Sequence, residues 1–248
     1  MKTLKPSEVY LSPKKAIERM QNIFDKYGIE RGLKSYSFQQ SRESWIAAVY
    51  LIGLSYVEKK IFWLKSNPIK NDAPDIFAVS YRKPHLAGEI GIVREIYQLE
   101  VCEYDKHSKY GLPEHIIKKL NNKYYPKDTV LLCYIDHGLG YKFRLGNVIS
   151  KLNKQKKIVS QIWLIYNTKD QKNTAYHISL VCPRTKPIVS FSVNYAFLFD
   201  KNFSVNVKDR ITRALINQPE ILTEKRGVNK DFKFEYIGKY IIPLPDDR

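Results

Sequence analysis

Two segments with a helical pattern of apolar residues lie near the start of the chain. The first begins after Ser12-Pro13, a pair typical of a helix start, and Gly28 marks its end. The second follows Ser41, a residue suited to cap a helix, and residues 42–53 are apolar nearly all round. We expect this second helix to be buried beneath a sheet. Residues 32–40 show no clear period and are expected to form a connector.

Strand patterns follow in the middle of the chain, where residues 59–64 look like the start of a strand. The apolar run 76–79 is bounded by turn residues and predicts a buried strand. Residues 96–104 alternate, which places Leu99 and Val101 on one face of a second strand and Glu100 on the other. We expect Leu99 and Val101 to point into the core.

A third helix and a further strand complete the central part. Pro113 is suited to the first turn of a helix, and Ile116, Ile117 and Leu120 give that helix an apolar stripe. The continuous apolar run 129–135 is typical of a central strand. The predicted order is therefore helix, two strands, helix and strand.

The C-terminal part is dominated by strand-like patterns. Strands are predicted over residues 161–166, 176–181 and 188–198. A helix is predicted over 207–217, and residues 232–237 and 240–242 are expected to form an edge strand or a docking segment.

These patterns divide the chain into three regions. Residues 1–40 form an N-terminal helical segment, residues 41–157 a central α/β core, and residues 158–248 a β-rich region. Three roles remain open for the last region. It extends the sheet of the same domain, recognises nucleic-acid sequence, or mediates formation of a homodimer.

Composition favours a polyanionic partner. The chain has 42 Lys and Arg against 25 Asp and Glu, a net charge of +17, and a pI near 9.6. Nucleic acid is the first partner that this charge predicts, and an anionic membrane surface is the second. The alternative is a solvated basic surface without a dedicated partner.

The cysteines and the apolar runs indicate which cellular compartment the chain is suited to. The three cysteines, Cys102, Cys133 and Cys182, show no metal-ligand spacing and lie in strand-like runs, which favours a reducing, cytoplasmic setting. Residues 1–10 lack the apolar core of a signal peptide. The longest apolar run, 45–57, is too short to span a bilayer, so we expect no membrane segment.

Two carboxylates on neighbouring predicted strands suggest a chemistry. Asp75 precedes the run 76–79, and Glu100 lies within the alternating strand. Carboxylate oxygens from adjacent strands suit a hard cation such as Mg²⁺, which keeps several of its waters. Such an ion orients a phosphate and activates water, which is the chemistry of phosphodiester hydrolysis.

The sequence resembles the PD-(D/E)xK nuclease superfamily, over about residues 41–136. The resemblance depends on Pro74-Asp75, on Glu100-Val101-Cys102 and on the element order around them. It implies a restriction-endonuclease-like mixed sheet flanked by helices. It also implies Mg²⁺ or Mn²⁺ held by Asp75, Glu100 and Val101, and DNA cleavage in restriction or phage defence. Cys102 stands where the family usually has Lys, so it joins the catalytic candidates.

The resemblance also suggests a third carboxylate. Family members often carry a Glu on the helix ahead of the Pro-Asp strand, and Glu43 and Glu58 are the two candidates, with Glu43 preferred. Glu43 is placed in the first turn of its predicted helix, where a carboxylate alternatively just complements the helix dipole.

Loop cations complete the set of candidates. Arg82 and Lys83 are expected to meet phosphates, and Lys106 or Lys109 to bind nucleic acid or to replace the missing motif Lys. His107 is a candidate proton acceptor. The alternative function is a nucleic-acid-binding protein that keeps the fold and has lost cleavage.

Overall fold

The computed structural model describes residues 8–69, 72–82, 93–105, 107–126, 128–136, 143–155, 159–167, 175–199, 209–226 and 232–235. Its strands are β1 (Glu8–Leu11), β2 (Phe62–Ser66), β3 (Ile76–Arg82), β4 (Val93–Asp105), β5 (Thr129–Asp136), β6 (Gln161–Tyr166), β7 (Ala175–Cys182), β8 (Ser190–Asn194), β9 (Ile221–Arg226) and β10 (Phe232–Glu235). Its helices are α1 (Pro13–Tyr27), α2 (Ile29–Lys34), α3 (Gln39–Glu58), α4 (Leu112–Asn121), α5 (Leu145–Leu152) and α6 (Arg210–Ile216), with short 3₁₀ turns η1 (Tyr36–Phe38) and η2 (Ala196–Leu198).

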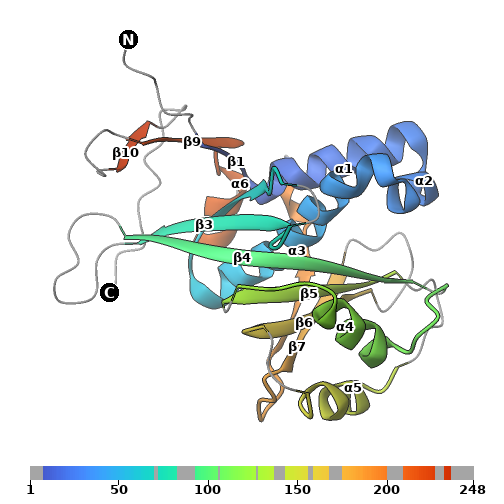
Figure 1. Ribbon diagram of the computed structural model, residues 1–248. Helices are drawn as coiled ribbons and strands as arrows, with labels where there is room; N and C mark the ends of the chain where they lie inside the picture. The colour runs from blue at the N-terminus through green and yellow to red at the C-terminus, as the bar shows by residue number, and fades with distance from the viewer. Residues whose placement is uncertain are drawn as a thin grey trace.

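One ten-stranded sheet runs through the described residues. Its strand order is β10-β9-β1-β2-β3-β4-β5-β6-β7-β8. The β4–β5 and β5–β6 pairs are parallel, and the other pairs are antiparallel. Helices α1 and α3 pack on one face, and α4 and α5 on the other (Figure 1). The predicted α/β class, a mixed sheet flanked by helices, is confirmed.

Helix α1 forms as its end signals predict. The Ser12 hydroxyl accepts a hydrogen bond from the Lys15 amide at 3.1 Å, and Pro13 occupies the first turn. Gly28 ends the helix with a φ of 83°, a value that favours glycine. Ala16, Ile17 and Met20 are buried against α3 and the sheet.

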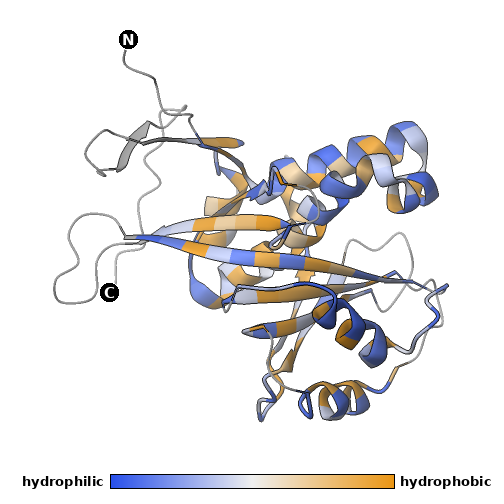
Figure 2. Cartoon of the chain, viewed as in Figure 1, coloured by the Kyte–Doolittle hydropathy of each residue, from blue (hydrophilic) through white to orange (hydrophobic). Residues whose placement is uncertain are grey.

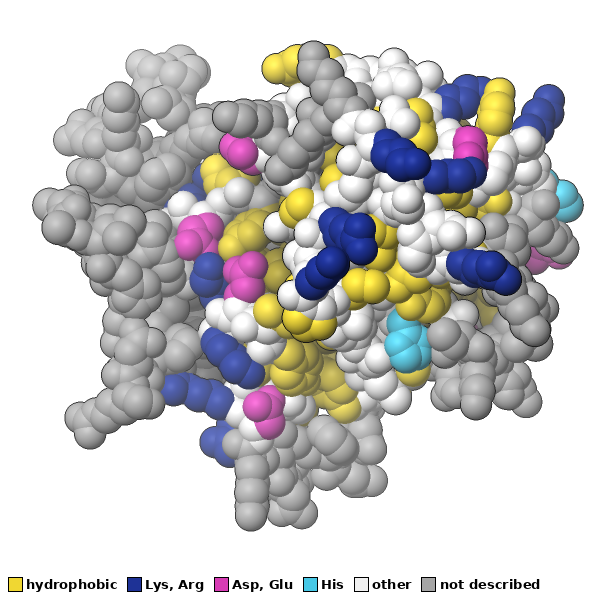
Figure 3. All heavy atoms as spheres, turned by 90° about the horizontal axis from the view of Figure 1, so that it is seen from below, with side chains coloured by type: hydrophobic (Ala, Val, Ile, Leu, Met, Phe, Trp, Pro, Cys, Tyr) yellow, Lys and Arg dark blue, Asp and Glu magenta, His cyan; other side chains and the backbone are white. Residues whose placement is uncertain are grey.

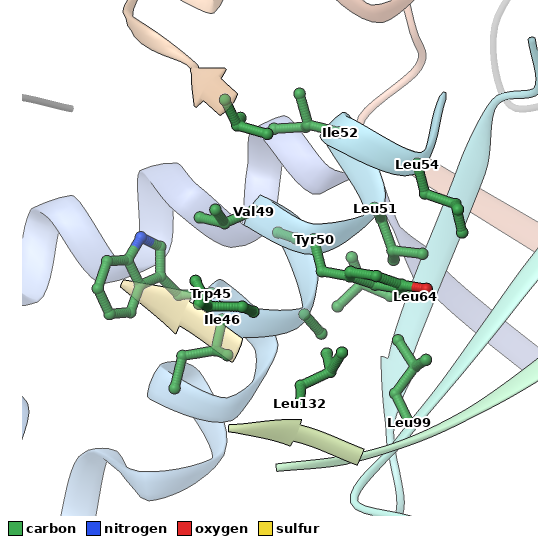
Figure 4. Close-up of a cluster of buried hydrophobic side chains, with 14 of the residues drawn as sticks. Trp45, Ile46, Val49, Tyr50, Leu51, Ile52, Leu54, Leu64, Leu99 and Leu132 are labelled. Carbon is green, nitrogen blue, oxygen red and sulfur yellow. The ribbon is translucent and has the colours of Figure 1, made fainter. Parts of the chain in front are cut away.

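Helix α3 is the buried helix of the core, but its predicted start was wrong. It begins at Gln39 rather than after Ser41 and continues to Glu58. Residues 42–55 are all buried, as the continuous apolar pattern predicts. Figure 4 shows Leu64, Leu99 and Leu132 from three strands beneath this helix. The predicted connector 32–40 instead contains the end of α2, the turn η1 and the start of α3.

The opposite face of the sheet is covered by α4 and α5. Helix α4 carries the predicted stripe, since Ile116 and Leu120 are buried. Helix α5 was not predicted, because its lysine-rich surroundings hid an apolar stripe formed by Leu145, Val148, Ile149 and Leu152. Both helices carry apolar and polar positions side by side in Figure 2.

The alternation along β4 is confirmed. Leu99 and Val101 pack in the cluster beneath α3, whereas Cys102 packs in the cluster beneath α4. Both faces of β4 are therefore covered at this level. Glu103, on the α3 side, pairs with Arg42 of α3 at 2.7 Å.

Strands from all three predicted regions join the one sheet. Strands β6 to β8 extend it on one side, although the predicted strand 188–198 is limited to β8 and followed by η2. Helix α6 is shorter than predicted and is capped by Asp209, which accepts from the Thr212 amide at 2.6 Å. Strand β10 is an edge strand as predicted, and residues 240–242 lie outside the described residues.

Two strands were missed, β1 and β9, which pair with each other between β2 and β10. Their pairing joins distant parts of the sequence, so no local sequence pattern predicts it. Within the described ranges, no helix has both the length and the apolar character needed to cross a membrane.

The contact between α3 and β8 gives a stability prediction. A methyl group on Gly53 would lie 2.0 Å from the Phe191 ring and 2.8 Å from Val193, whereas one on Gly146 of α5 would meet nothing within 4 Å. We expect Gly53→Ala to lower the free energy of unfolding by about 1–3 kcal/mol through overpacking. Gly146→Ala, the matched helix control, should be neutral or slightly stabilising. Urea unfolding measures both, and equal effects would contradict the described packing.

Candidate functional site

The two predicted carboxylates lie side by side. Ile76 pairs with Leu99 in the antiparallel β3–β4 ladder, so Asp75 is level with Glu100 just outside the start of β3. The Val101 amide donates a hydrogen bond to Asp75 Oδ2 at 2.8 Å. Amide and carbonyl of one strand residue point to the same side, so the Val101 carbonyl also faces Asp75. The predicted convergence is present in the structure.

Two lysines, one on α4 and one just after it, form ion pairs with these carboxylates. Lys119 Nζ and Lys123 Nζ each lie 2.7 Å from Glu100 Oε1. Lys123 Nζ is also 4.0 Å from Asp75 Oδ1, so it bridges the two acids. Lys119 belongs to α4, and Lys123 follows two residues after the helix ends. The sequence patterns gave no indication that Lys119 meets Glu100.

Glu100 is the most buried member of the site. Its side chain is 0% exposed, whereas that of Asp75 is 14% exposed. Oε2 of Glu100 is buried and, within the residues that the structure describes, has no hydrogen-bond partner. The same holds for Oε1 of Gln98, which shares a strand face with Glu100, and for Oγ1 of Thr129, which pairs with Gln98 in register. Such unsatisfied buried oxygens are costly unless another group binds them.

Burial and charge shift the acids toward their protonated forms. Burial, and then the neighbouring Glu100 charge, raise the pKa of Asp75 to about 6, against the opposing effect of Lys119. Burial, and then the Asp75 charge, raise the pKa of Glu43 to about 7. Burial opposes the charged form of Lys119, but Glu100 and Asp75 raise its pKa above the ordinary value. At neutral pH Glu43 is therefore poised between two protonation states, while Lys119 stays charged.

Of the two helix candidates, Glu43 is close to the site. It accepts a hydrogen bond from Gln39 at 2.8 Å, and its charge interacts with that of Asp75. The expected first-turn position is wrong, because α3 starts earlier and Glu43 lies in its second turn. Glu58 lies at the other end of α3, where it pairs with Lys60 at 3.2 Å and accepts from the Tyr97 hydroxyl at 2.9 Å.

Cys102 is a core residue, contrary to its expected place among the catalytic groups. Its thiol is buried in the cluster beneath α4, opposite Cys133 on β5. Hydrogen bonding with Cys133, and then with His115, lowers the pKa of the Cys102 thiol. In this structure the thiol packs in the core and is 2% exposed. The ammonium groups that reach Glu100 come instead from Lys119 of α4 and from Lys123 just after it.

Those predicted loop cations that the structure describes do not gather at the carboxylates. Arg82 ends β3 at the end opposite Asp75, which over this seven-residue strand is about 20 Å away. Lys109 is exposed before α4, whereas Lys119 and Lys123 lie at the other end of that helix. His107 is exposed, and its amide donates to Asp105 at 3.0 Å. Lys83 and Lys106 lie outside the described residues.

The oxygen donors fit a hard cation better than a soft one. The Asp75 and Glu100 carboxylates are both bound by Lys123, the Val101 backbone contacts Asp75, and Glu100 Oε2 is buried without a hydrogen-bond partner in the described structure. Among the described residues, no group of three or more His, Cys, Asp and Glu side chains is placed to hold a metal ion. Any ion here would therefore take only these few protein ligands and keep its waters, as Mg²⁺ does. Lys123 stands between the acids and would have to turn outward.

Comparisons of the chain with protein-family models, with curated proteins and with solved structures gave no match. The interpretation of the site therefore depends on its own geometry.

The raised pKa of Glu43 predicts a pH-dependent stability. Folding favours its protonated form, so the stabilisation is complete below the ordinary pKa of 4.5 and is lost as the pH rises through about 7. We expect Glu43→Gln, which cannot ionise, to gain about 2–3 kcal/mol relative to the parent between pH 5 and pH 8. Urea unfolding at both pH values tests this. If the unfolding free energies of the two proteins changed with pH in the same way, the raised pKa of Glu43 would be contradicted.

The ion pairs around Glu100 predict an asymmetry between neighbouring lysines. Lys119→Met leaves the buried Glu100 charge with one partner and should cost about 2–3 kcal/mol of unfolding free energy. Lys118→Met removes an exposed ammonium that stacks on Tyr110 and should cost less than about 1 kcal/mol. Thermal or urea unfolding at pH 8 compares them. Similar losses would mean that Lys119 is not a counter-ion of Glu100.

Proposed function

We propose that this chain is a metal-dependent endonuclease that hydrolyses phosphodiester bonds in DNA, using Mg²⁺ or Mn²⁺. The order α3, β2, β3, β4, α4, β5 supports a restriction-endonuclease-like core, with three antiparallel strands followed by a parallel fourth. The net charge of +17 supports a polyanionic substrate. The preference for DNA, and a role in restriction or phage defence, follow from the sequence resemblance.

The observation that carries this proposal is the convergence of Asp75 and Glu100 with Lys119. The carboxylates come from two strands and lie level in the ladder, and the ammonium group of Lys119 is 2.7 Å from Glu100. This arrangement supplies two anionic ligands and one cation beside them. A site for phosphoryl transfer needs both, because charge develops on the phosphate oxygens in the transition state.

Each residue of the site would have a separate role in the reaction. Asp75, Glu100 and the Val101 carbonyl would hold the cation, which when bound supplies a polarised water and stabilises the leaving oxygen. Lys119 holds a positive charge at Glu100 and is placed to offset charge on the phosphate. Glu43, whose pKa is about 7, can take up a proton close to Asp75. Lys123 is 24% exposed and can turn to solvent without moving the helix.

One observation favours a second candidate, a nucleic-acid-binding protein without cleavage. Lys119 and Lys123 already neutralise Glu100, and Glu100 is fully buried beneath them. If these ion pairs are permanent, no cation enters, and the site only stabilises the fold. The two candidates differ in whether Lys123 leaves the acids when a divalent ion is present.

Plasmid nicking tests the proposal. With Mg²⁺ or Mn²⁺ we expect the parent chain to nick supercoiled DNA, and Asp75→Ala and Glu100→Gln to lose at least about 100-fold in rate. Glu58→Gln changes a carboxylate at the far end of α3 and should leave the rate unchanged.

Metal binding gives a second readout. Mn²⁺ should raise the midpoint of thermal unfolding of the parent but not of Glu100→Gln. DNA binding by a parent chain that neither nicks DNA nor responds to either metal would establish the second candidate. Nicking that survives in Asp75→Ala and Glu100→Gln would place the chemistry elsewhere.

A further inference from the structure

The side of the molecule covered by α4 and α5 is rich in exposed cations. We call it the α4–α5 face and define it by six side chains, Lys109, Lys118, Arg144, Lys154, Arg184 and Lys186, all exposed. Lys and Arg side chains gather on the surface that Figure 3 shows from below, where α5 lies. Glu114 of α4, an acid on this face, is paired with Lys151 of α5 at 2.5 Å. Helices α4 and α5 contain no other acid, so the remaining charge of these two helices is positive.

A groove lies within this face. It has a volume of about 470 Å³ and runs between α5 and the segment 184–188 after β7. Arg184 and Lys186 line one side, and Gly146 and Ser150 of α5 line the other. Because Gly146 has no side chain, the wall of the groove formed by α5 is shallow at this residue. A groove of this kind suits an extended, negatively charged backbone.

An exposed aromatic ring directly follows a residue of the carboxylate site in the sequence. The Tyr124 side chain is 87% exposed, and it directly follows Lys123, which bridges Asp75 and Glu100. Its backbone is fixed on both sides, because the next residue, Tyr125, is buried and its hydroxyl donates to the Lys119 carbonyl at 3.0 Å. The ring is thus presented to solvent from a rigid support.

We propose that the α4–α5 face binds unpaired nucleotides, with the phosphates on its cations and a base stacked on Tyr124. The attachment of Tyr124 beside Lys123 would bring the phosphate of the stacked nucleotide to the carboxylates. Only this last step rests on the proposed nuclease function. The binding itself requires the face alone.

Unpaired nucleotides fit this face better than a duplex does. A protruding ring stacks on a base only if the face of that base is free, and in a duplex the neighbouring bases cover it. Tyr110 adds a second ring near the N-terminal end of α4, where Lys118 Nζ lies 4.5 Å from the ring centre. Exposed rings thus come just before and just after α4, and Lys118 of the helix contacts the first of them, a combination of ring and cation that suits single strands.

Binding in EDTA, which prevents any metal-dependent cleavage, tests the role of Tyr124. Labelled oligo(dT) and a labelled duplex of equal length are titrated with the full chain. We expect Tyr124→Ala to weaken oligo(dT) binding about tenfold and to leave duplex binding unchanged. Tyr124→Phe, which keeps the ring, should bind like the parent. Tyr36→Ala removes a 70% exposed ring on the opposite side of the sheet and should have no effect.

Charge reversal tests the path of the backbone. Lys154→Glu with Lys186→Glu should weaken oligo(dT) binding and flatten its dependence on salt, because fewer counter-ions are released. Lys26→Glu with Arg31→Glu makes the same change in net charge on α1 and α2 and should have a much smaller effect. Equal losses from the two pairs, or parental oligo(dT) binding by Tyr124→Ala, would overturn the proposal. Since no cleavage is measured, failure of the nuclease proposal leaves these results intact.

Discussion

Glu100 is a charged group on a central strand with no access to water, and such a group is tolerated only beside opposite charge. Lys119 and Lys123 supply that charge, so the ion pairs and the apolar stripe of α4 together fix the helix over β4. Asp75 depends on the same arrangement, because it shares Lys123 with Glu100 and accepts from the backbone of β4. The residues that form the site therefore also hold α4 against the sheet.

The parts of the fold that the sequence predicts are those specified by local patterns. The alternation along residues 96–104 placed Leu99 and Val101 on one face and Glu100 on the other, and α1 was delimited by Ser12-Pro13 and Gly28. Period and capping depend on neighbours a few residues away, so they can be read from the chain directly. The approach of Asp75 to Glu100 followed from the expectation that their strands are neighbours.

The remaining features depend on contacts between distant segments. Lys119 and Lys123 lie beside the stripe formed by Ile116 and Leu120, at spacings of three or four residues, but the pattern does not say what lies opposite them. Helix α5 is different, because its stripe was present in the sequence and was overlooked among lysines. The neighbourhood of Glu43 and Asp75 depends on where α3 crosses the sheet, which no local pattern specifies.

The pairing of β1 with β9 has a consequence for synthesis of the chain. β1 contacts β2 at one residue pair but is matched along its whole length by β9, which lies about 210 residues further along. During translation β1 therefore waits for its main partner until about 210 further residues have been made. Until then, the edge of β1 that β9 will cover keeps unpaired amide and carbonyl groups open to solvent or to a chaperone.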